Sequence, residues 1–406
     1  MAACKFAVGV IAVFCFSLYG VDGQQAGITI SHTCAVSCSD KISCWGDNRF
    51  GQLGSNNTNL TENQIEMRDV KQISAGGGHT CALKNDGSVS CWGNNLNGQL
   101  GNSFNSGTNN ATVTPLDVDI LNVKQITAGG THTCALKNDG SVSCWGLNIF
   151  GQLGNSLNIG TLDPNPNPLN VNISNVKQIS AGFAHTCALK NDGSVSCWGY
   201  NIFGQLGNSQ NIGTKNPNPN PLDVNISNVK KISTGQRHTC ALKNDGSVFC
   251  WGYNKFGQLG NSLNFNTSDV SFTPLNVNIS NVKQISVAPL HTCALKNDGT
   301  VFCWGLNKYG QLVYTFTPEE TQMTPYNIVV GNIVSLVAAI YSTCTLYDTK
   351  EVYCIGKQDN DVSQFFYKAA TDVAFLSDSI DENTCSTNDD DDDDDDTKLS
   401  IPVIVG

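Results

Sequence analysis

HTCALKNDGSVSCWG, residues 79–93, is the stretch that decides the fold of this 406-residue chain, because it recurs along the chain with few changes. Tryptophan occurs only inside copies of this stretch, and every histidine lies two residues before the first cysteine of a copy. The tryptophans are Trp45, Trp92, Trp145, Trp198, Trp251 and Trp304, and the histidines are His32, His79, His132, His185, His238 and His291. A weaker seventh copy spans residues 342–356, with Ile355 in the position of tryptophan. A repeat of about 50 residues indicates an array of equivalent structural units.

Each copy has the pattern of β-strands joined by a tight turn. In the second copy, residues 70–73, 80–84 and 88–92 predict three strands, and residues 94–100 are expected to form a short fourth strand or edge. Asn85-Asp86-Gly87 suits a three-residue hairpin loop, in which Asn and Asp form a type I turn and Gly takes the position with positive φ. Four strands in each of seven repeats predict an all-β fold, a seven-bladed β-propeller of four-stranded antiparallel blades.

The full repeat, G-x-x-H-T-C-A-L-x-x-D-G-x-V-x-C-W-G-x-N-x-x-G-Q-L-G, resembles the regulator of chromosome condensation repeat from residue 26 to about residue 385. The resemblance implies a seven-bladed propeller. Similar Cys-Trp-Gly repeats form the ectodomain of crinkly4-type receptor kinases. The family also includes a nucleotide-exchange factor for a nuclear GTPase and a secreted β-lactamase inhibitor, so the resemblance leaves both an exchange role and an inhibitor-like binding role open.

Fourteen of the eighteen cysteines form seven pairs whose members are ten positions apart. In the regular copies, each pair is centred on the aspartate of the turn, so its members face each other across the hairpin at ~4.5 Å between Cα atoms, a distance that disulfides accept. The expected bonds are Cys34–Cys44, Cys81–Cys91, Cys134–Cys144, Cys187–Cys197, Cys240–Cys250, Cys293–Cys303 and Cys344–Cys354. The alternative, a zinc site, has weak support because Cys-x9-Cys lacks the Cys-x2-Cys spacing.

Cys38 and Cys385 remain in the mature chain after these pairs are assigned. Cys38 lies in the turn of the first hairpin. Cys385 ends a segment, residues 372–385, that resembles the opening strand of a repeat, which the first repeat lacks. We predict that this segment completes the first blade and that Cys38 and Cys385 form a disulfide that closes the ring.

The two ends of the chain differ in composition from the repeats. Residues 1–23 have the features of a signal peptide, with Lys5 before an apolar stretch at 6–19, and the alternative is an uncleaved anchor. Residues 24–386 are assigned to the propeller and residues 387–406 to a disordered acidic tail. Seven Asn-x-Ser/Thr sequons are predicted glycosylation sites: Asn56, Asn59, Asn110, Asn172, Asn225, Asn266 and Asn278. These features predict a secreted or lumenal glycoprotein with no membrane span after signal cleavage, a compartment in which disulfides persist.

Charge and residue pattern exclude several classes of function. The net charge is −11, of which Asp389–Asp396 supply −8, and no basic patch favours nucleic acid as a partner. The histidines repeat in one frame, so we expect each to hydrogen-bond a neighbouring loop, and the alternatives are a metal ring or pH sensing. The tryptophans are expected to pack between blades. No cofactor, metal site or catalytic residue is predicted, because a nucleophile, base and acid should be unique residues in one place.

Positions at which the copies differ are the candidates for binding. They include the pair before each histidine and the residues after Trp-Gly. Aromatic and arginine residues are the usual anchors of interfaces, which selects Phe183, Tyr200, Arg237, Tyr253 and Lys255. The alternative is neutral drift after duplication. The Asn-Pro runs at 165–168 and 216–221 are expected to stiffen exposed loops along a glycan-covered edge, near Asn172, Asn225 and Asn278.

The sequence therefore predicts a monomeric propeller that binds an unidentified extracellular protein or glycan. The alternatives are a structural component of a wall, matrix or coat, and an exchange-factor-like activity, which secretion disfavours.

Overall fold

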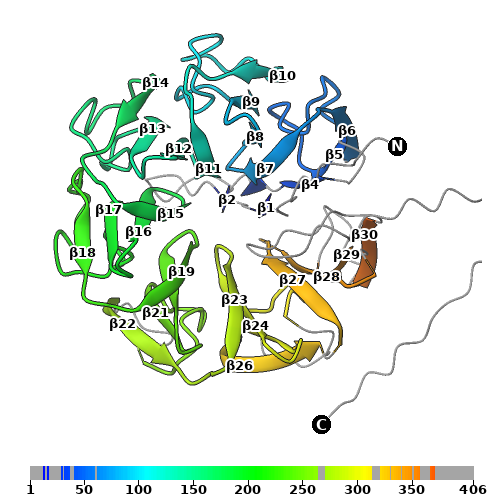
Figure 1. The fold of residues 1–406 in the computed structure, drawn as a ribbon, viewed down its shortest axis with the longest axis vertical. Helices are drawn as coiled ribbons and strands as arrows, with labels where there is room; N and C mark the ends of the chain where they lie inside the picture. The colour runs from blue at the N-terminus through cyan, green and yellow to red at the C-terminus, as the bar shows by residue number, and fades with distance from the viewer. Residues whose placement is uncertain are drawn as a thin grey trace, which may run out of the picture.

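Seven four-stranded antiparallel sheets surround a common axis, like blades of a propeller (Figure 1). The computed structural model describes residues 12–13, 16–17, 29–30, 32–36, 41–59, 62–263, 270–312, 321–329, 331–339, 341–349, 352–356 and 366–370. These residues contain strands, turns and bends, and no helix. The predicted fold class is therefore confirmed.

The strands of each blade follow one another from the central axis outward (Figure 1). Blade 1 has β1 (Ala12–Val13), β4 (His32–Val36), β5 (Lys41–Gly46) and β6 (Glu62–Glu66); blade 2 has β7 (Val70–Ala75), β8 (His79–Lys84), β9 (Val89–Gly93) and β10 (Thr112–Asp117); blade 3 has β11 (Val123–Ala128), β12 (His132–Lys137), β13 (Val142–Gly146) and β14 (Asn165–Asn170). Blade 4 has β15 (Val176–Ala181), β16 (His185–Lys190), β17 (Val195–Gly199) and β18 (Leu222–Val224); blade 5 has β19 (Val229–Thr234), β20 (His238–Lys243), β21 (Val248–Gly252) and β22 (Ser271–Val277). Blade 6 has β23 (Val282–Val287), β24 (His291–Lys296), β25 (Val301–Leu306) and β26 (Thr321–Val329); blade 7 has β27 (Ile333–Ala338), β28 (Ser342–Tyr347), β29 (Val352–Gly356) and β30 (Phe366–Ala370). A separate two-stranded sheet pairs β2 (Phe16–Ser17) with β3 (Thr29–Ile30).

The central hairpin of each regular blade has the predicted turn. In blade 2, the Gly87 amide donates to the Lys84 carbonyl at 3.0 Å, and the Lys84 amide donates to the Ser88 carbonyl at 2.9 Å. Gly87 has a φ of 84°, which side chains disfavour, so glycine is required there. The Asp86 carboxylate accepts the Ser88 amide at 2.9 Å and fixes the end of the turn.

All seven predicted hairpin disulfides are present in the structure. Their cysteines are direct cross-strand partners, as in the Cys187↔Cys197 register of β16 and β17. The Cα atoms of the bonded pairs lie 4.0–4.1 Å apart. The symmetry of each pair about its turn is what brings the two sulfur atoms together.

The fourth strand is not where the sequence predicted it. Residues 94–100 form turns, and the outer strand of blade 2 is β10, which begins at Thr112. The side chain of Asn95 explains the difference, because it satisfies the loop backbone. Its amide donates to the carbonyls of Asn102 and Phe104 at 2.8 and 2.7 Å, and its oxygen accepts the Leu100 amide at 3.0 Å. An asparagine in this position favours a closed loop over an extended strand.

The Asn-Pro runs also differ from expectation. Residues 165–168 belong to β14 rather than to a loop, and Pro166 and Pro168 are tolerated because β14 is an outer edge strand. Residues 216–221 precede the short strand β18 and agree with the predicted loop.

Blade 1 begins with a strand from the segment predicted to be a signal peptide. β1 pairs with β4, with Ala12 opposite Cys34 and Val13 opposite Thr33. This is the edge that the sequence analysis assigned to residues 372–385. Those residues, Cys38 and Cys385 lie outside the described part of the chain, so the closing strand and the Cys38–Cys385 bond stay predictions, as do signal cleavage and the acidic tail.

The hydrophobic core lies between neighbouring blades, as predicted for the tryptophans. At the junction of blades 3 and 4, Cys134, Cys144 and Leu153 pack against Ile179 and Trp198 of the next blade. The last glycine of Gly-Gln-Leu-Gly makes room for this packing. A Cβ atom on Gly154 would lie 3.0 Å from Trp198 Nε1 and 2.6 Å from a methyl group of Val171. Gly101, Gly207 and Gly260 lie equally close to Trp145, Trp251 and Trp304, so these junctions need a residue without a side chain beside the tryptophan.

Candidate binding face

The strand ends define two faces of the ring with different residues. In blade 3, His132 is paired with Gly146, so the loop before β12 and the loop after β13 leave the blade on one side. We call this side the Trp-Gly face. Val123 is paired with Lys137, so the hairpin turn and the junction loop between blades lie on the other side. We call that side the turn face.

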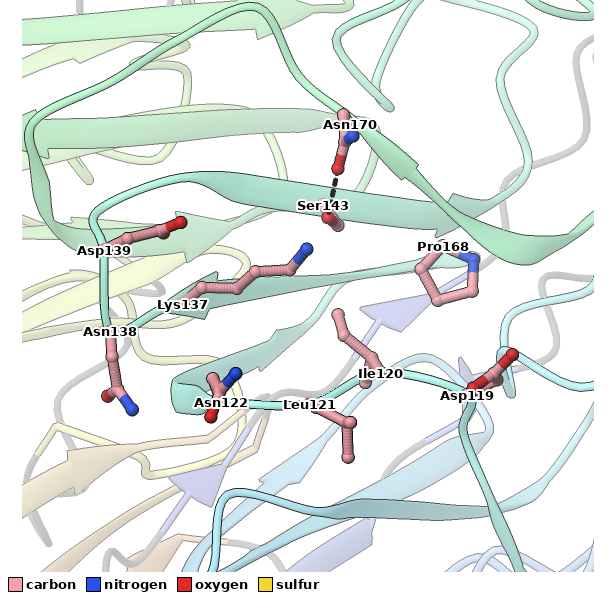
Figure 2. Close-up of a pocket in the computed structure, with 10 residues that line it drawn as sticks. All are labelled: Asp119, Ile120, Leu121, Asn122, Lys137, Asn138, Asp139, Ser143, Pro168 and Asn170. Atoms are coloured by element: carbon pink, nitrogen blue, oxygen red, sulfur yellow. Dashed lines mark hydrogen bonds between the residues drawn. The ribbon is translucent and has the colours of Figure 1, made fainter.

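The turn face has a hollow of about 570 Å³ between blades 2 and 3 (Figure 2). Asp119, Leu121, Lys137 and Asp139 line it, and the Ser143 hydroxyl donates to the Asn170 side chain at 3.0 Å. The hydroxyl and amide of Ser141 bind the carboxylate of Asp139 and lower its pKa. Aspartates equivalent to Asp139 lie in the other regular turns, so this carboxylate serves the hairpin and does not mark a unique site.

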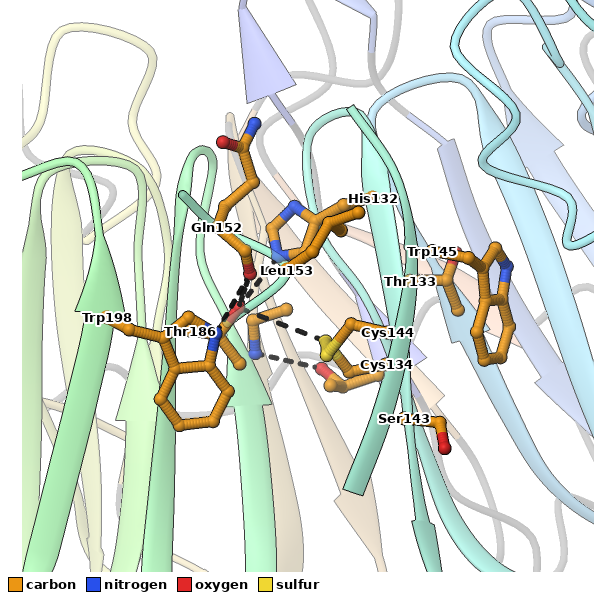
Figure 3. The surroundings of a disulfide bond; sticks show 12 residues. His132, Thr133, Cys134, Ser143, Cys144, Trp145, Gln152, Leu153, Thr186 and Trp198 are labelled. Carbon is orange, nitrogen blue, oxygen red and sulfur yellow. Dashed lines mark hydrogen bonds between the residues drawn. A yellow bond between two sulfur atoms is a disulfide. The ribbon is translucent and has the colours of Figure 1, made fainter. Parts of the chain in front are cut away.

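A buried hydrogen-bond relay joins the blades on the side of the Trp-Gly face (Figure 3). The Thr186 hydroxyl of blade 4 donates to the Gln152 carbonyl of blade 3 at 3.0 Å, and it lies 2.9 Å from His132 Nε2. The Trp198 indole N–H donates to the same carbonyl at 3.0 Å. A hydroxyl has one proton, so Thr186 accepts from an Nε2–H group and His132 has the Nε2-protonated neutral form. We call this set the His-Thr-Gln-Trp relay.

The relay repeats at six junctions of the ring. The histidine-to-threonine contacts are His32–Thr80, His79–Thr133, His132–Thr186, His185–Thr239, His238–Thr292 and His291–Thr343, at 2.7–3.0 Å. The last of these lacks tryptophan because Ile355 replaces it. In blade 7, Ser342 replaces histidine, so the junction that closes the ring is built differently. The histidines thus have the predicted structural role, but each partner is a threonine in a strand of the next blade and not a loop as expected.

Burial holds the relay histidines neutral. It lowers the pKa of His132 to about 3 and that of His32 to about 4. The pKa values of His79, His185, His238 and His291 are also lowered to about 3, chiefly by burial. A proton on Nδ1 would create a cation in a site that water does not reach. Within the described residues, no group of three or more His, Cys, Asp or Glu is arranged to hold a metal ion.

The Trp-Gly face carries a chain of aromatic rings in contact across blades 3, 4 and 5. Ring centroids are 4.3 Å apart for Phe150 and Tyr200, 6.3 Å for Tyr200 and Phe203, 5.0 Å for Phe203 and Tyr253, and 6.2 Å for Tyr253 and Phe256. All five side chains are half-buried. We call them the aromatic ladder. Three of the four ring pairs meet edge to face and the Phe150–Tyr200 pair is tilted, which are favourable arrangements for aromatic side chains.

Arg237 lies on the aromatic ladder. Its guanidinium carbon is 4.6 Å from the centroid of Phe203 and 5.6 Å from that of Tyr253. The loop between β19 and β20 positions it directly before His238, which the relay fixes in the core. A guanidinium over two rings is held in place by cation–π attraction.

Of the five residues predicted to bind, Tyr200, Arg237 and Tyr253 come together in this one array. Lys255 is exposed in the same loop as Tyr253, and Phe183 lies half-buried over Gly130 at the junction before the aromatic ladder. Whether these residues bind anything stays a prediction. Three members of the aromatic ladder were not predicted to bind: Phe150, Phe203 and Phe256, each two residues before the glutamine of Gly-Gln-Leu-Gly. Their signal was an aromatic residue in a fixed frame beside the variable tyrosines.

The predicted glycosylation sites divide between the faces. Asn172, Asn225 and Asn278 are exposed in junction loops, on the turn face. Asn56, Asn59 and Asn110 are exposed in loops of blades 1 and 2, and Asn266 lies outside the described residues. In blade 3 the Asn-Pro run begins at Asn165, at the Trp-Gly end of β14, whereas the sequon at Asn172 follows the other end of the strand. The Asn-Pro runs and the sequons therefore do not lie along one edge, as had been expected. The part of the chain described here contains no helix long and apolar enough to span a membrane.

Comparisons with known proteins agree with this architecture. Residues 119–365 match the RCC1-like domain, and residues 39–83, 70–99 and 86–136 match the regulator of chromosome condensation (RCC1) repeat. The ultraviolet-B receptor UVR8 of Arabidopsis thaliana is 32% identical over 70% of this chain and 64% of its own length. The probable E3 ubiquitin-protein ligase HERC4 of Rattus norvegicus is 36% identical over 71% of this chain and 28% of its own length. The chain thus spans less than two thirds of these relatives.

A solved structure extends the likeness to the fold. The crystal structure of Prp20p from Saccharomyces cerevisiae matches with a TM-score of 0.67 and 22% identity, and the match covers 80% of this chain and 82% of that one. Sequence repeats, blade topology and the match to more than half of the chain lead to one assignment. The chain belongs to the family of RCC1-like repeat propellers.

Proposed function

We propose that this chain is a secreted, disulfide-bonded propeller that binds another protein through its Trp-Gly face. The observation that carries the proposal is the aromatic ladder with Arg237, which lies on the loops rather than in the core. Tyrosine and arginine are enriched among the residues that contribute most to protein–protein binding. The repeated residues of the scaffold, by contrast, are buried and bonded to one another.

The relatives support a binding role of this kind. The Prp20p structure is described with the binding properties of that protein to Gsp1p and histones, and a second structure has the same protein bound to Kap60. UVR8 is a receptor and HERC4 is a ligase of much greater length. Propellers of this family thus occur in proteins of different activity. This agrees with a common scaffold in which the loop residues determine the binding specificity.

Affinity capture from an extracellular fraction tests the binding face. The baits are the whole chain, the double variant Phe203→Ser/Tyr253→Ser, and Leu121→Ser as a control on the turn face, where Leu121 is 71% exposed. We expect a stoichiometric protein partner on the whole chain and on the control, and its loss from the double variant. Equal capture by all three baits, or a partner that binds only while its glycans are intact, contradicts the proposal.

Secretion needs a separate test. The chain is expressed with residues 1–23 in cultured eukaryotic cells, and the medium is examined by N-terminal sequencing and by treatment with an N-glycosidase. We expect a product that begins near residue 24 and loses apparent mass on deglycosylation. Retention inside the cell with an intact N-terminus contradicts this part of the proposal.

A further inference from the structure

The hollow on the turn face between blades 2 and 3 brings groups of opposite charge together beside an apolar wall. The carboxylates of Asp119 and Asp139 and the ammonium group of Lys137 line it, and Ile120 and Pro168 form part of its apolar wall. Figure 2 shows the Lys137 side chain extending toward the middle of these residues. A volume of about 570 Å³ is in the range of pockets that hold small organic ligands.

Lysine recurs at the position of Lys137 in blades 2 to 6, and in the other four blades its surroundings follow two patterns. In blade 4, the Lys190 ammonium group pairs with the Asp223 carboxylate at 3.1 Å. Blade 2 has the same residue types as blade 4, a serine at Ser90 and an aspartate at Asp117. In blades 5 and 6 the ammonium group lies instead over a phenylalanine ring, 5.3 and 5.4 Å from its centroid, in the pairs Lys243–Phe249 and Lys296–Phe302. Each pattern supplies an acid or a ring beside the lysine.

Blade 3 mixes the two patterns and has neither the acid nor the ring. Ser143 stands where blades 5 and 6 have phenylalanine, and Asn170 stands where blades 2 and 4 have aspartate. The Ser143 hydroxyl donates to the side-chain oxygen of Asn170 at 3.0 Å, so the amide N–H groups of Asn170 remain as donors. Among the residues that the structure describes, the Lys137 ammonium group has no hydrogen bond, ion pair or ring contact. Its three N–H donors are therefore available to a ligand in the hollow.

Carboxylate oxygens border the same hollow. The amide and the hydroxyl of Ser141 both donate to Oδ1 of Asp139, at 2.9 and 2.7 Å, so Oδ2 remains an acceptor. Asp139 also interacts electrostatically with Lys137, as the equivalent aspartates do with their lysines in blades 2, 4, 5 and 6. Asp119 is exposed, and it replaces the asparagine that begins a predicted glycosylation site at the next three junctions: Asn172, Asn225 and Asn278. The hollow thus places acceptors next to a donor that blade 3 leaves unpaired.

A neutral ligand with several hydroxyl groups fits this combination. A hydroxyl group donates one hydrogen bond and accepts others, so neighbouring hydroxyls can bond the ammonium group and the carboxylates at the same time. Hydrogen bonds to charged groups are stronger than those between neutral groups. The two carboxylates oppose an anion, and the ammonium group opposes a cation. The lining therefore favours a ligand without net charge.

We infer that this hollow is a binding site for a neutral saccharide. The saccharide hydroxyls bond Lys137, Asp119 and Asp139, and its C–H surface lies against Pro168. The site is on the opposite face of the ring from the aromatic ladder. It goes beyond the proposed function and does not depend on it.

An array of oligosaccharides built from hexoses, pentoses and N-acetylhexosamines tests this inference, with neutral members and members that carry uronate or sulfate groups. The full-length chain, treated with an N-glycosidase to remove any glycans of its own, should bind neutral members. Calorimetric titration with the best of these in solution should show a loss of affinity of roughly tenfold or more for Lys137→Met and for Asp119→Asn. Lys190→Met is the matched control, because Lys190 has the same position in blade 4 and pairs with Asp223, and it should change affinity less than about twofold.

The outcomes separate this site from the binding face. No binding to a neutral oligosaccharide, stronger binding of acidic ones, or equal affinity of Lys137→Met and Lys190→Met overturns the inference. Array binding that the free oligosaccharide does not compete also overturns it. Capture of a protein partner through the aromatic ladder should be insensitive to Lys137→Met and to the oligosaccharide. The saccharide site can therefore fail while the proposed function stands, and the reverse also holds.

Discussion

The His-Thr-Gln-Trp relay and the aromatic ladder lie at the same end of the blades. They differ in burial and in the number of blades in which they recur. The relay is buried and recurs at six junctions. The aromatic ladder is half-exposed and, among the described residues, runs over blades 3 to 5, since leucine replaces its tyrosine at Leu147 of blade 3 and Leu306 of blade 6. A repeated contact holds neighbours together, while a contact that only some blades make is available for recognition. Stability should therefore depend on the relay, and binding on the aromatic ladder.

Acid provides the largest test of the relay. The folded chain keeps its histidines neutral with pKa values of about 3 to 4, below the ordinary 6.5, so the unfolded chain binds more protons between these values. The free energy of unfolding is therefore highest above pH 6.5, and it declines as the pH falls toward the pKa values of the folded chain. Six such groups lower the free energy of unfolding by ~8 kcal/mol at pH 5.5, which is comparable to the whole stability of many domains.

Urea denaturation at pH 7.5 and pH 5.5, with the disulfides intact, measures this loss. His185→Ser, which copies the serine of blade 7, should reduce the pH dependence by about one sixth, since one of six equivalent groups is removed. An unchanged denaturation midpoint between the two pH values would show that the histidines are solvated or paired as cations.

The hairpin disulfides should contribute the next largest effect. Cys187→Ala with Cys197→Ala opens a loop of ten residues in blade 4. We expect the free energy of unfolding to fall by ~2.5–3 kcal/mol, because the unfolded chain regains the entropy of that loop. Calorimetry of the double variant checks the value, and the equivalent pair of blade 5, Cys240 and Cys250, serves as a replicate. An effect near zero in both blades would mean that the hairpins are ordered without their bonds.

The hydroxyl at the centre of the relay should contribute less. Thr186→Val keeps the shape of the side chain but leaves the Nε2–H of His132 buried without an acceptor. The Gln152 carbonyl keeps the indole N–H of Trp198 as a donor. We expect a loss of ~1–3 kcal/mol in the free energy of unfolding, the cost of one unsatisfied buried group. Thr273→Val, on the exposed side of β22, is the control and should change stability by less than about 0.5 kcal/mol.

The contrast also explains what the sequence could predict. The strands and the disulfides follow from patterns within one hairpin, where spacing alone sets the partner of Cys81 as Cys91. The role of the histidines was predicted in kind, but their partner Thr186 could not be identified because it belongs to the next blade. The position of the fourth strand was wrong because hydrogen bonds from the Asn95 side chain, rather than the alternation of apolar residues, decide that segment.

The binding residues show a different limit. Comparison of the copies selected Tyr200 and Tyr253 because they vary, and the same criterion passed over Phe203 because it recurs. In the structure, Phe203 contacts Tyr200, Tyr253 and Arg237. Variable residues were thus found without the repeated residue that joins them. Comparison of equivalent positions in the repeats tests each position separately. A binding surface depends on which residues of neighbouring blades come into contact.

Phe203 therefore gives the finest test of the division between stability and binding. Phe203→Leu keeps an apolar side chain in the loop of blade 4 but removes the ring that Arg237 and the two tyrosines share. We expect the free energy of unfolding to fall by only ~1 kcal/mol, since ring pairs contribute about 0.5–1.5 kcal/mol and the side chain is half-buried. Partner capture should be lost nonetheless, because Arg237 would no longer be held in one orientation. A loss of stability as large as that of the disulfide variant, with capture unchanged, would place the aromatic ladder with the scaffold and leave the binding face to be sought elsewhere.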